Sequence, residues 1–225
     1  MKSLLVGLFV IALLSACNTV SPTTDSKADA QAIVDDARQV VERFKASNQG
    51  ATITGLLSAA KGVIIYPSIV KAAFFVGGEG GTGVLLGRGE DGEWSSPAFF
   101  TFGAASYGLQ IGAEESKVLM IITNDETLSR AAEGGLEFGA NATIAAGSEG
   151  LKGSISTDDL QDIYYFAEIE RGLFAGINLK GATAVPRDAL NAAYYGQPTT
   201  AKAIIIDRSR TNELASPLQA ALSAP

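Results

Sequence analysis

The sequence contains no histidine and one cysteine among its 225 residues. The lack of histidine excludes Ser-His-Asp and Cys-His nucleophiles, histidine-ligated zinc and a haem held by a proximal histidine. A single cysteine excludes an internal disulfide and a cysteine-rich metal site. We therefore expect no metal, no cofactor and no imidazole-dependent catalysis.

Charged residues are also sparse. They make up 18% of the chain, and the 24 acidic residues outnumber the 17 basic ones, so the formal net charge is −7. An acidic surface repels nucleic acid and does not attract anionic lipid through bulk charge. We expect no nucleic-acid partner, and any contact with an anionic lipid must be local. The 47% of hydrophobic residues and the 25 glycines are typical of one compact, turn-rich domain.

The first apolar run, Leu4–Leu14, follows Lys2 and ends just before Cys17. This run is too short to span a bilayer and is typical of a secretory signal peptide. Leu14–Cys17 resembles the lipobox of bacterial lipoproteins, in which the cysteine is diacylated and becomes the mature N-terminus. We predict a signal peptide at 1–16 and an acylated tether at 17–28. The alternative is that Cys17 is an ordinary residue of the apolar segment and that cleavage leaves a soluble protein.

The residue after the cysteine is Asn18 rather than Asp. By the same resemblance, this favours secretion across the inner membrane and anchoring in the outer membrane, facing the periplasm. Two acyl chains are enough for stable anchoring, because each buried methylene contributes about 0.8 kcal/mol.

Helical periodicity begins after the tether. Apolar residues recur on one helix face between Ile33 and Phe44, and Ser26 with Asp29 resembles a capping box. The polar face of this helix is mixed in sign, so we predict that it packs on its own domain rather than on a membrane. A second short helix is expected at Ile53–Ala60.

From Lys61 onward, short apolar runs separated by glycine replace the helical pattern. The runs are rich in β-branched and aromatic residues, as strands are. They are Val63–Tyr66, Ala73–Val76, Val84–Leu86, Ala98–Phe102, Leu109–Ile111, Val118–Ile122, Thr143–Ala145, Ile163–Phe166 and Leu173–Ile177. The connections leave no room for crossover helices, so most neighbouring strands should pair antiparallel.

Two further helices are expected at Asp125–Glu133 and Arg187–Tyr195, and a polar flexible tail at 207–225. The predicted fold is therefore α+β. A mostly antiparallel curved sheet, barrel-like or a sandwich, would carry an N-terminal amphipathic helix and short C-terminal helices. The predicted domain spans 29–206.

The segment Gly78–Gly83 matches the G-x-G-x-x-G pattern of dinucleotide-binding proteins. In those proteins the glycines leave a strand and begin a helix. Here Val84–Gly87 follows and resembles a strand, so the required helix is missing. We interpret the glycines as a hairpin, or as a place where one backbone segment closely approaches another.

Clustered carboxylates offer an enzymatic alternative, since a glycosidase needs only a pair of them. The acidic candidates are Glu79, Glu90, Asp91, Glu93, Glu114 and Glu115. No apolar setting singles out one pair, and acids in turns are usually solvated. A Ser-Lys nucleophile is chemically allowed, but no spacing selects one. We interpret Trp94 as a residue that packs in the core.

Local basic residues are the candidates for a lipid headgroup. Lys61 and Lys71 flank Val63–Tyr66 and have few acids nearby, and Arg88 is the third candidate. The alternative is that these side chains are simply solvated.

Several motifs in one order resemble the SYLF domain family of lipid-binding proteins. They are Ala60–Pro67, Gly77–Leu85, Gly92–Phe99, Ser106–Gly112, Gly172–Gly176 and Asn191–Gly196. The resemblance covers about residues 30–206. Eukaryotic members bind phosphoinositides or other anionic phospholipids, partly through an N-terminal amphipathic segment, and some bind actin.

Two departures limit what this resemblance implies. The sequence contains no SH3 or FYVE module, and the helix at Ala30–Phe44 lacks a strongly basic face. Phosphoinositide specificity and actin binding are therefore not carried over. The expected function is that of a membrane-anchored, non-enzymatic protein of the bacterial envelope that binds anionic phospholipid or fatty acyl groups. The alternatives are a carboxylate-dependent cell-wall glycan hydrolase and an envelope scaffold without a small ligand, and no protein partner is identified.

Overall fold

The computed structural model describes residues 25–138, 151–154, 163–171, 179 and 181–224. The helical elements are α2 (Lys27–Lys45), α3 (Gly50–Ala59), α4 (Asp125–Gly134), α5 (Asp188–Tyr195), α6 (Ala201–Ile205), η2 (Glu213–Ala215) and α7 (Ser216–Ser223). The strands are β1 (Gly62–Gly87), β2 (Ala98–Ile122), β3 (Leu136–Glu137), β4 (Leu151–Ser154), β5 (Ile163–Arg171) and β6 (Thr183–Pro186). They form one six-stranded sheet with antiparallel pairing, which confirms the predicted α+β class.

Local sequence signals set the helix ends. The Ser26 hydroxyl accepts a hydrogen bond from the Asp29 amide at 3.1 Å and caps α2, as its sequence spacing predicted. Asn124 caps α4 in the same way, and α5 ends at Gly196, whose φ is 72°. The helices predicted around 53–60, 125–133 and 187–195 are confirmed. Among the described residues, no helix is long and apolar enough to cross a bilayer.

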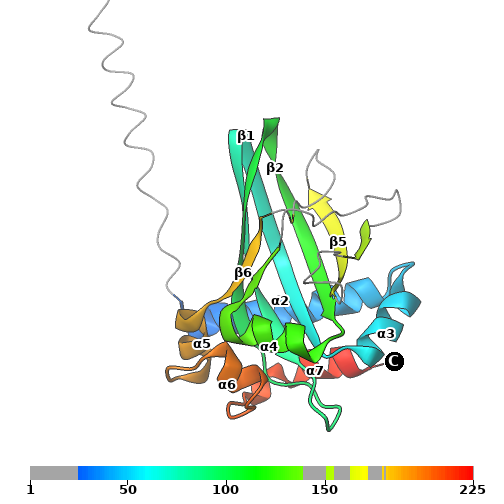
Figure 1. Ribbon diagram of the computed structural model, residues 1–225, viewed down its shortest axis with the longest axis vertical. Helices are drawn as coiled ribbons and strands as arrows, with labels where there is room; N and C mark the ends of the chain where they lie inside the picture. The colour runs from blue at the N-terminus through cyan, green and yellow to red at the C-terminus, as the bar shows by residue number, and fades with distance from the viewer. Residues whose placement is uncertain (1–24, 139–150, 155–162, 172–178, 180, 225) are drawn as a thin grey trace, which may run out of the picture.

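The short runs predicted as separate strands merge into two long ones. β1 contains three of the runs and β2 contains three, and the two strands pair along almost their whole length, from Gly62 with Ile122 to Leu85 with Ala98. Both strands reach the end of the molecule that lies opposite the helices (Figure 1). The predicted runs Thr143–Ala145 and Leu173–Ile177 lie outside the described residues.

The β1–β2 hairpin folds back on itself, and glycines permit the contact. A Cβ atom on Gly81 would lie 2.3 Å from the carbonyl oxygen of Ser68, and one on Gly83 would lie 2.2 Å from that of Ile65. The second half of β1 therefore lies against its first half. The interpretation of Gly78–Gly83 as a turn is wrong, because these residues lie within β1; the alternative, a close backbone approach, is confirmed.

We call β1 and β2 together the folded hairpin. Its outer end comprises residues 70–79 of β1 and the paired residues 104–115 of β2. This end lies beyond the layer of helices in Figure 1.

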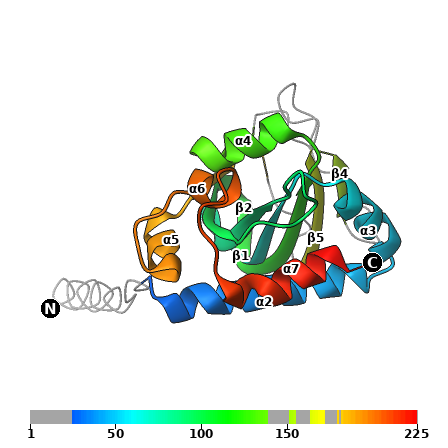
Figure 2. The same cartoon turned by 90° about the horizontal axis from the view of Figure 1, so that it is seen from below.

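Both faces of the sheet are buried near the helices. On one face Ile64, Tyr66 and Leu85 pack in a core that includes residues of α4 and α6. On the other face Val63 and Ile65 pack in a core that includes residues of α2, α3, α5 and α7. Figure 2 shows α2 and α7 side by side below the sheet and α4 on the opposite side. Burial on both faces explains why the strand sequences are continuous apolar runs rather than alternating ones.

The C-terminal segment is ordered, contrary to the predicted flexible tail at 207–225. Within α7, Leu218 and Leu222 are 0% and 3% exposed. The Lys45 ammonium of α2 donates a hydrogen bond to the Ala221 carbonyl at 2.8 Å. The two buried leucines supply the apolar contact that the polar composition of this segment concealed. The predicted signal peptide at 1–16 and Cys17 lie outside the described residues.

Candidate functional site

Lys61 lies on the surface at the beginning of β1. Its Nζ is 3.0 Å from an Oδ atom of Asp125, and the two side chains are 45% and 71% exposed. An ion pair this exposed contributes about 0–1 kcal/mol, so it can exchange for a contact with another anion. Lys61 therefore remains a suitable residue for a headgroup contact.

Arg88 stabilises the fold with its guanidinium group. It donates hydrogen bonds to the carbonyl oxygens of Gly92 (2.8 Å), Leu57 (3.2 Å) and Ser58 (2.8 Å). Its guanidinium carbon lies 5.6 Å from the centroid of the Trp94 ring. These contacts join the end of α3 to the loop between β1 and β2, so the guanidinium is not open to a headgroup in this arrangement.

Lys71 lies far from Lys61, at the outer end of the folded hairpin. Ten residues of strand separate them, or roughly 30 Å at the usual rise per residue. Lys71 stands directly opposite Glu114 in the β1–β2 pairing, and its Nζ is 3.1 Å from a carboxylate oxygen of Glu79. Its side chain is 12% exposed and that of Glu79 is 0% exposed. The structure therefore does not bring the two lysines together at one headgroup.

Lys71 belongs to a group of buried polar residues that we call the polar cluster: Lys71, Glu79, Glu114, Ser116 and Tyr165. Glu114 is 2% exposed, and the Ser116 hydroxyl donates to one of its carboxylate oxygens at 3.2 Å. Among the described residues, the other Glu114 oxygen and the Tyr165 hydroxyl are buried without a hydrogen-bond partner. The cluster lies where the apolar core gives way to the outer end of the folded hairpin.

The polar cluster contains more acidic than basic groups. Lys71 is its one ammonium among the described residues, and Glu79 and Glu114 are two carboxyl groups. Burial raises the pKa of Glu114, and the nearby Glu79 charge raises it further, against the opposing effects of the Ser116 hydroxyl and Lys71. Burial, together with both carboxylates, also raises the pKa of Tyr165 well above its ordinary value.

Sequence reasoning had named all three charged members separately but not their association. Glu79 and Glu114 were candidate acids, and Lys71 was a candidate for a headgroup. They meet because the fold-back of β1 places Glu79 beside Lys71, while strand pairing places Glu114 opposite Lys71. No spacing in the sequence indicates that fold-back, although the run of small residues at Gly80–Gly83 permits it.

Among the carboxylates considered for glycan hydrolysis, Glu79 does not form an open pair with Glu93 or with Glu114. Glu79 is buried beside Lys71, whereas Glu93 is exposed in the loop that joins β1 to β2 at the opposite end of the hairpin. Glu79 and Glu114 do lie near one another, but both are shielded from solvent. A glycosidase needs two carboxyl groups on either side of an accessible bond. Neither of these pairs provides that arrangement.

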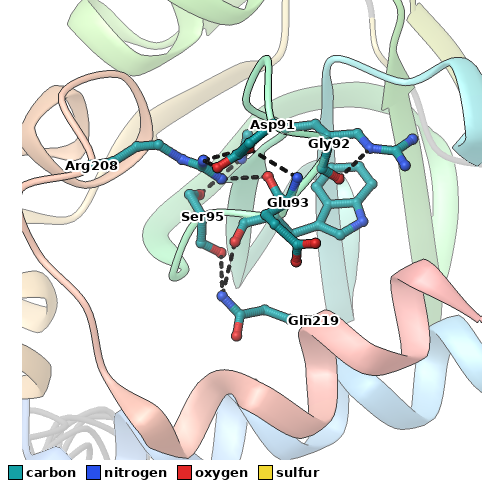
Figure 3. A network of polar contacts seen from close by, with 9 residues as sticks. Asp91, Gly92, Glu93, Ser95, Arg208 and Gln219 are labelled. Atoms are coloured by element: carbon teal, nitrogen blue, oxygen red, sulfur yellow. Dashed lines mark hydrogen bonds and ion pairs between the residues drawn. The ribbon is translucent and has the colours of Figure 1, made fainter.

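The loop around Trp94 is held by the C-terminal segment (Figure 3). Arg208 contacts both carboxylate oxygens of Asp91 at 2.9 Å, and the Gln219 side-chain amide donates to the carbonyls of Trp94 (3.0 Å) and Ser95 (3.1 Å). A pocket of about 320 Å³ lies between this loop and residues 208–219. Trp94 itself is 4% exposed and packs in the core shared with α2, which fits the predicted packing role.

A second, larger depression of about 640 Å³ lies between the polar face of α2 and the strand residues Pro67, Ser68, Glu115 and Lys117. Its charged lining mixes both signs. Three acids and two bases line it, so it has no net attraction for a lipid phosphate.

The outer end of the folded hairpin has an apolar sequence, and it lies beyond the helices. Val70 is 49% exposed, and the run from Val70 to Val76 contains six apolar residues and Lys71. The backbone of Phe74 pairs with Ile111, and that of Val76 pairs with Tyr107, so the opposite strand is apolar there too. An apolar sequence on a strand end beyond the helices is a candidate surface for contact with lipid.

Comparison with known proteins gives a consistent relationship. A family model, Ysc84, described as Las17-binding protein actin regulator, matches residues 103–225. SH3 domain-containing YSC84-like protein 1 of Rattus norvegicus is 35% identical over 153 residues, which cover 67% of this chain and 44% of that protein. Protein YSC84 of Saccharomyces cerevisiae is 30% identical over 168 residues, which cover 72% of this chain and 36% of that protein.

This chain therefore spans less than half the length of these relatives. The family description names binding and regulation rather than a reaction. The matched region includes most of β2 and all the elements that follow it, and it accounts for more than half of the chain. The chain belongs to the Ysc84 family, the SYLF domain family that its sequence motifs resemble.

Proposed function

We propose that this protein is a membrane-anchored, non-enzymatic lipid-binding protein of the bacterial cell envelope. It binds anionic phospholipid or fatty acyl groups through the outer end of the folded hairpin. The observation that carries the proposal is the apolar sequence of that end, from Val70 to Val76, on a strand that lies beyond the helices. Val70 shows that part of this apolar surface is exposed to solvent.

Transfer of such side chains into lipid is favourable. Complete burial of a valine or phenylalanine side chain contributes about 1.5–3 kcal/mol. A few such residues provide enough free energy for reversible membrane contact in a protein that is already anchored. Acyl contact is then the main interaction, because the acidic chain gains nothing from diffuse attraction to anionic lipid.

A headgroup contact contributes less. Lys61 is the better candidate, since its ion pair with Asp125 is exposed, whereas Lys71 is nearly buried beside Glu79. A lysine near an anionic membrane surface contributes about 1 kcal/mol, and the effect fades within a Debye length.

Anchoring is proposed to come from Cys17. Its place at the end of an apolar leader supports acylation there, and Asn18 supports transfer to the outer membrane with the domain facing the periplasm. The residues that follow are rich in Ser and Thr, and we propose that they act as a tether.

Protein binding is the second candidate function. The family description and the name LAS seventeen-binding protein 3, given to a relative from Saccharomyces cerevisiae, refer to a protein partner of those proteins. If this chain binds a protein of the envelope rather than a lipid, it acts as a scaffold. The catalytic alternative has less support, because buried Glu79 forms no accessible pair with Glu93 or Glu114.

Vesicle flotation tests the lipid proposal. The change is Val70→Asp with Phe74→Asp, and the control is Val185→Asp, which adds an acid at another exposed valine, 42% exposed, on β6. Binding to phosphatidylglycerol vesicles should weaken at least tenfold in the double variant and stay within twofold of the unchanged protein in the control. Equal binding by all three proteins would contradict a role for the outer end.

Two further measurements separate acyl contact from headgroup contact and from scaffolding. Lys61→Glu should weaken binding severalfold at low salt only, because its contribution is screened. Mass spectrometry of lipids extracted from purified protein should show bound phospholipid or fatty acid. A protein that carries no lipid and does not bind vesicles would instead support the scaffold.

A further inference from the structure

The polar cluster lies at the point where the two halves of the folded hairpin meet. Glu79 comes from the second half of β1, and Lys71 comes from the first half; their charged atoms are 3.1 Å apart. Glu114 approaches the same place from β2, and Tyr165 from β5. The contacts of Glu79 with the other three side chains therefore depend on the hairpin being folded back.

The charges in the closed arrangement balance only when one carboxyl group is neutral. Lys71 compensates for Glu79, with which it forms the ion pair, and Glu114 is the remaining acid. Glu114 is 2% exposed, its side chain accepts one hydrogen bond from Ser116, and its second oxygen has no partner among the described residues. A buried carboxylate in this setting is unfavourable unless it holds a proton.

The groups that face Glu114 do not remove this penalty. On β1 they are Lys71, whose charge favours an ionised Glu114 but also compensates for Glu79, and Glu79, which has the same sign as an ionised Glu114. On β2 the Ser116 hydroxyl gives a single hydrogen bond at 3.2 Å. On β5 Tyr165 is 1% exposed, and its hydroxyl has no hydrogen-bond partner in the described part of the chain. Burial raises the pKa of Tyr165, so the hydroxyl remains neutral in the ordinary pH range.

We propose that Glu114 is a proton switch: when uncharged it allows the folded hairpin to close, and when ionised it opens the outer end. Opening begins at the outer end because the helices cover the opposite end of the hairpin (Figure 1). The direction agrees with the pKa of Glu114, which burial raises above its ordinary value. An acid with a raised pKa in the folded state stabilises the closed form at low pH, and this stabilisation is lost as the pH rises through the raised pKa.

This inference does not depend on lipid binding and is tested without a ligand. Amide hydrogen exchange is measured on the full chain at pH 5.5 and pH 8.5, after correction for the intrinsic exchange rates. In the unchanged protein, exchange of residues 70–80 should be at least tenfold faster at the higher pH. Glu114→Gln should remove this difference and keep slow exchange at both values.

Glu115→Gln is the matched control. Glu115 is the next residue on β2 and accepts a hydrogen bond from Ser68 at 2.8 Å, outside the polar cluster. This variant should keep the pH dependence of the unchanged protein. An unchanged pH dependence in Glu114→Gln, or its loss in Glu115→Gln, would overturn the proposal.

A direct titration covers the case in which Glu114→Gln does not fold. The carboxyl carbon of Glu114 in the unchanged protein, followed by nuclear magnetic resonance, should titrate above the range of an exposed glutamate. Titration at an ordinary value of about 4.3 would overturn the proposal regardless of the exchange data.

Discussion

At the residue scale, glycines determine whether the hairpin can fold back. The pattern of Gly78–Gly83 alone allows a hairpin or a close backbone approach, because it does not distinguish conformational freedom from close packing. None of these glycines has a positive φ, so conformational freedom does not explain why glycine occurs at these positions. Space is the reason at Gly81 and Gly83, where a Cβ would meet the backbone of the first half of β1.

Gly83→Ala should therefore destabilise the protein, and Gly78→Ala should not. The added methyl of the first variant would lie 2.2 Å from the Ile65 carbonyl oxygen, whereas the nearest atom to that of the second is 3.9 Å away. Overpacking of this kind costs about 1–3 kcal/mol, and a surface change stays within about 0.5 kcal/mol. The melting temperatures of the two variants, monitored by circular dichroism, test this prediction. Similar melting temperatures for the two variants would contradict the close approach.

The same residue scale shows where sequence reasoning was sufficient. The capping of α2 by Ser26 and the burial of Trp94 could be predicted, because both depend on neighbours in the sequence. The polar cluster could not be assembled in the same way. Lys71 and Glu114 are 43 residues apart in sequence, and their meeting depends on the strand register. Glu79 joins them only through the fold-back of β1.

At the scale of elements, apolar periodicity located the helices well and the strand ends poorly. Helices α4 and α5 agree with their predicted ranges because Asn124 caps the beginning of α4 and a glycine follows the end of each helix. Within β1 and β2, glycines that looked like boundaries are strand residues. Antiparallel pairing over almost the whole hairpin keeps their backbone hydrogen-bonded, so low strand propensity at single positions is overridden.

The C-terminal helix shows a different limit of sequence reasoning. Its composition is that of a tail, and two leucines four residues apart were too weak a pattern to indicate a packed helix. In the structure both leucines are buried in the core that contains the apolar face of α2.

Leu218→Ala tests whether α7 is part of the fold. Truncation of a fully buried leucine destabilises a protein by about 2–5 kcal/mol, because transfer free energy is lost and a cavity remains. Chemical denaturation should therefore show a clear loss of unfolding free energy. Leu214→Ala is the control, since Leu214 is 48% exposed, and it should change stability by less than about 0.5 kcal/mol. A tail that does not pack would show no difference between the two.

At the scale of the whole molecule, the proposed anchor restricts how the domain meets the membrane. The first described residue, Asp25, is held by an ion pair with Arg187, so the tether is fixed to the domain near the start of α2. Nine residues from Cys17 to Asp25 span at most about 30 Å. The first half of the hairpin, from Gly62 to Phe74, extends roughly 40 Å at the usual strand rise.

These lengths define two orientations. If the hairpin stands away from the anchoring membrane, its outer end cannot touch that membrane and can reach only an opposing surface. If the domain lies on its side, the outer end and the anchor contact the same bilayer. We expect the second orientation, because apolar contact with lipid is favourable and the tether is long enough to allow the domain to lie down.

A fluorescent probe on Ala72→Cys distinguishes the two orientations. Ala72 lies at the exposed outer end, and the new thiol is the only one available for labelling if Cys17 is acylated. Protein anchored in phosphatidylglycerol vesicles is mixed with lipids that carry a nitroxide quencher, placed either in the anchoring vesicles or in a second vesicle population. A probe on Glu126→Cys of α4, whose side chain is 82% exposed, serves as the reference.

Quenchers in the anchoring vesicles should reduce the fluorescence of the probe at residue 72 more than that at residue 126. Stronger quenching from the second population would mean that the hairpin bridges two surfaces, which would contradict the expected orientation but keep the lipid contact. No quenching in either case would exclude lipid contact by the outer end. The tether would then serve to position a different face, and the nearest exposed basic group along β1, Lys61, would become the part of the strand to test next.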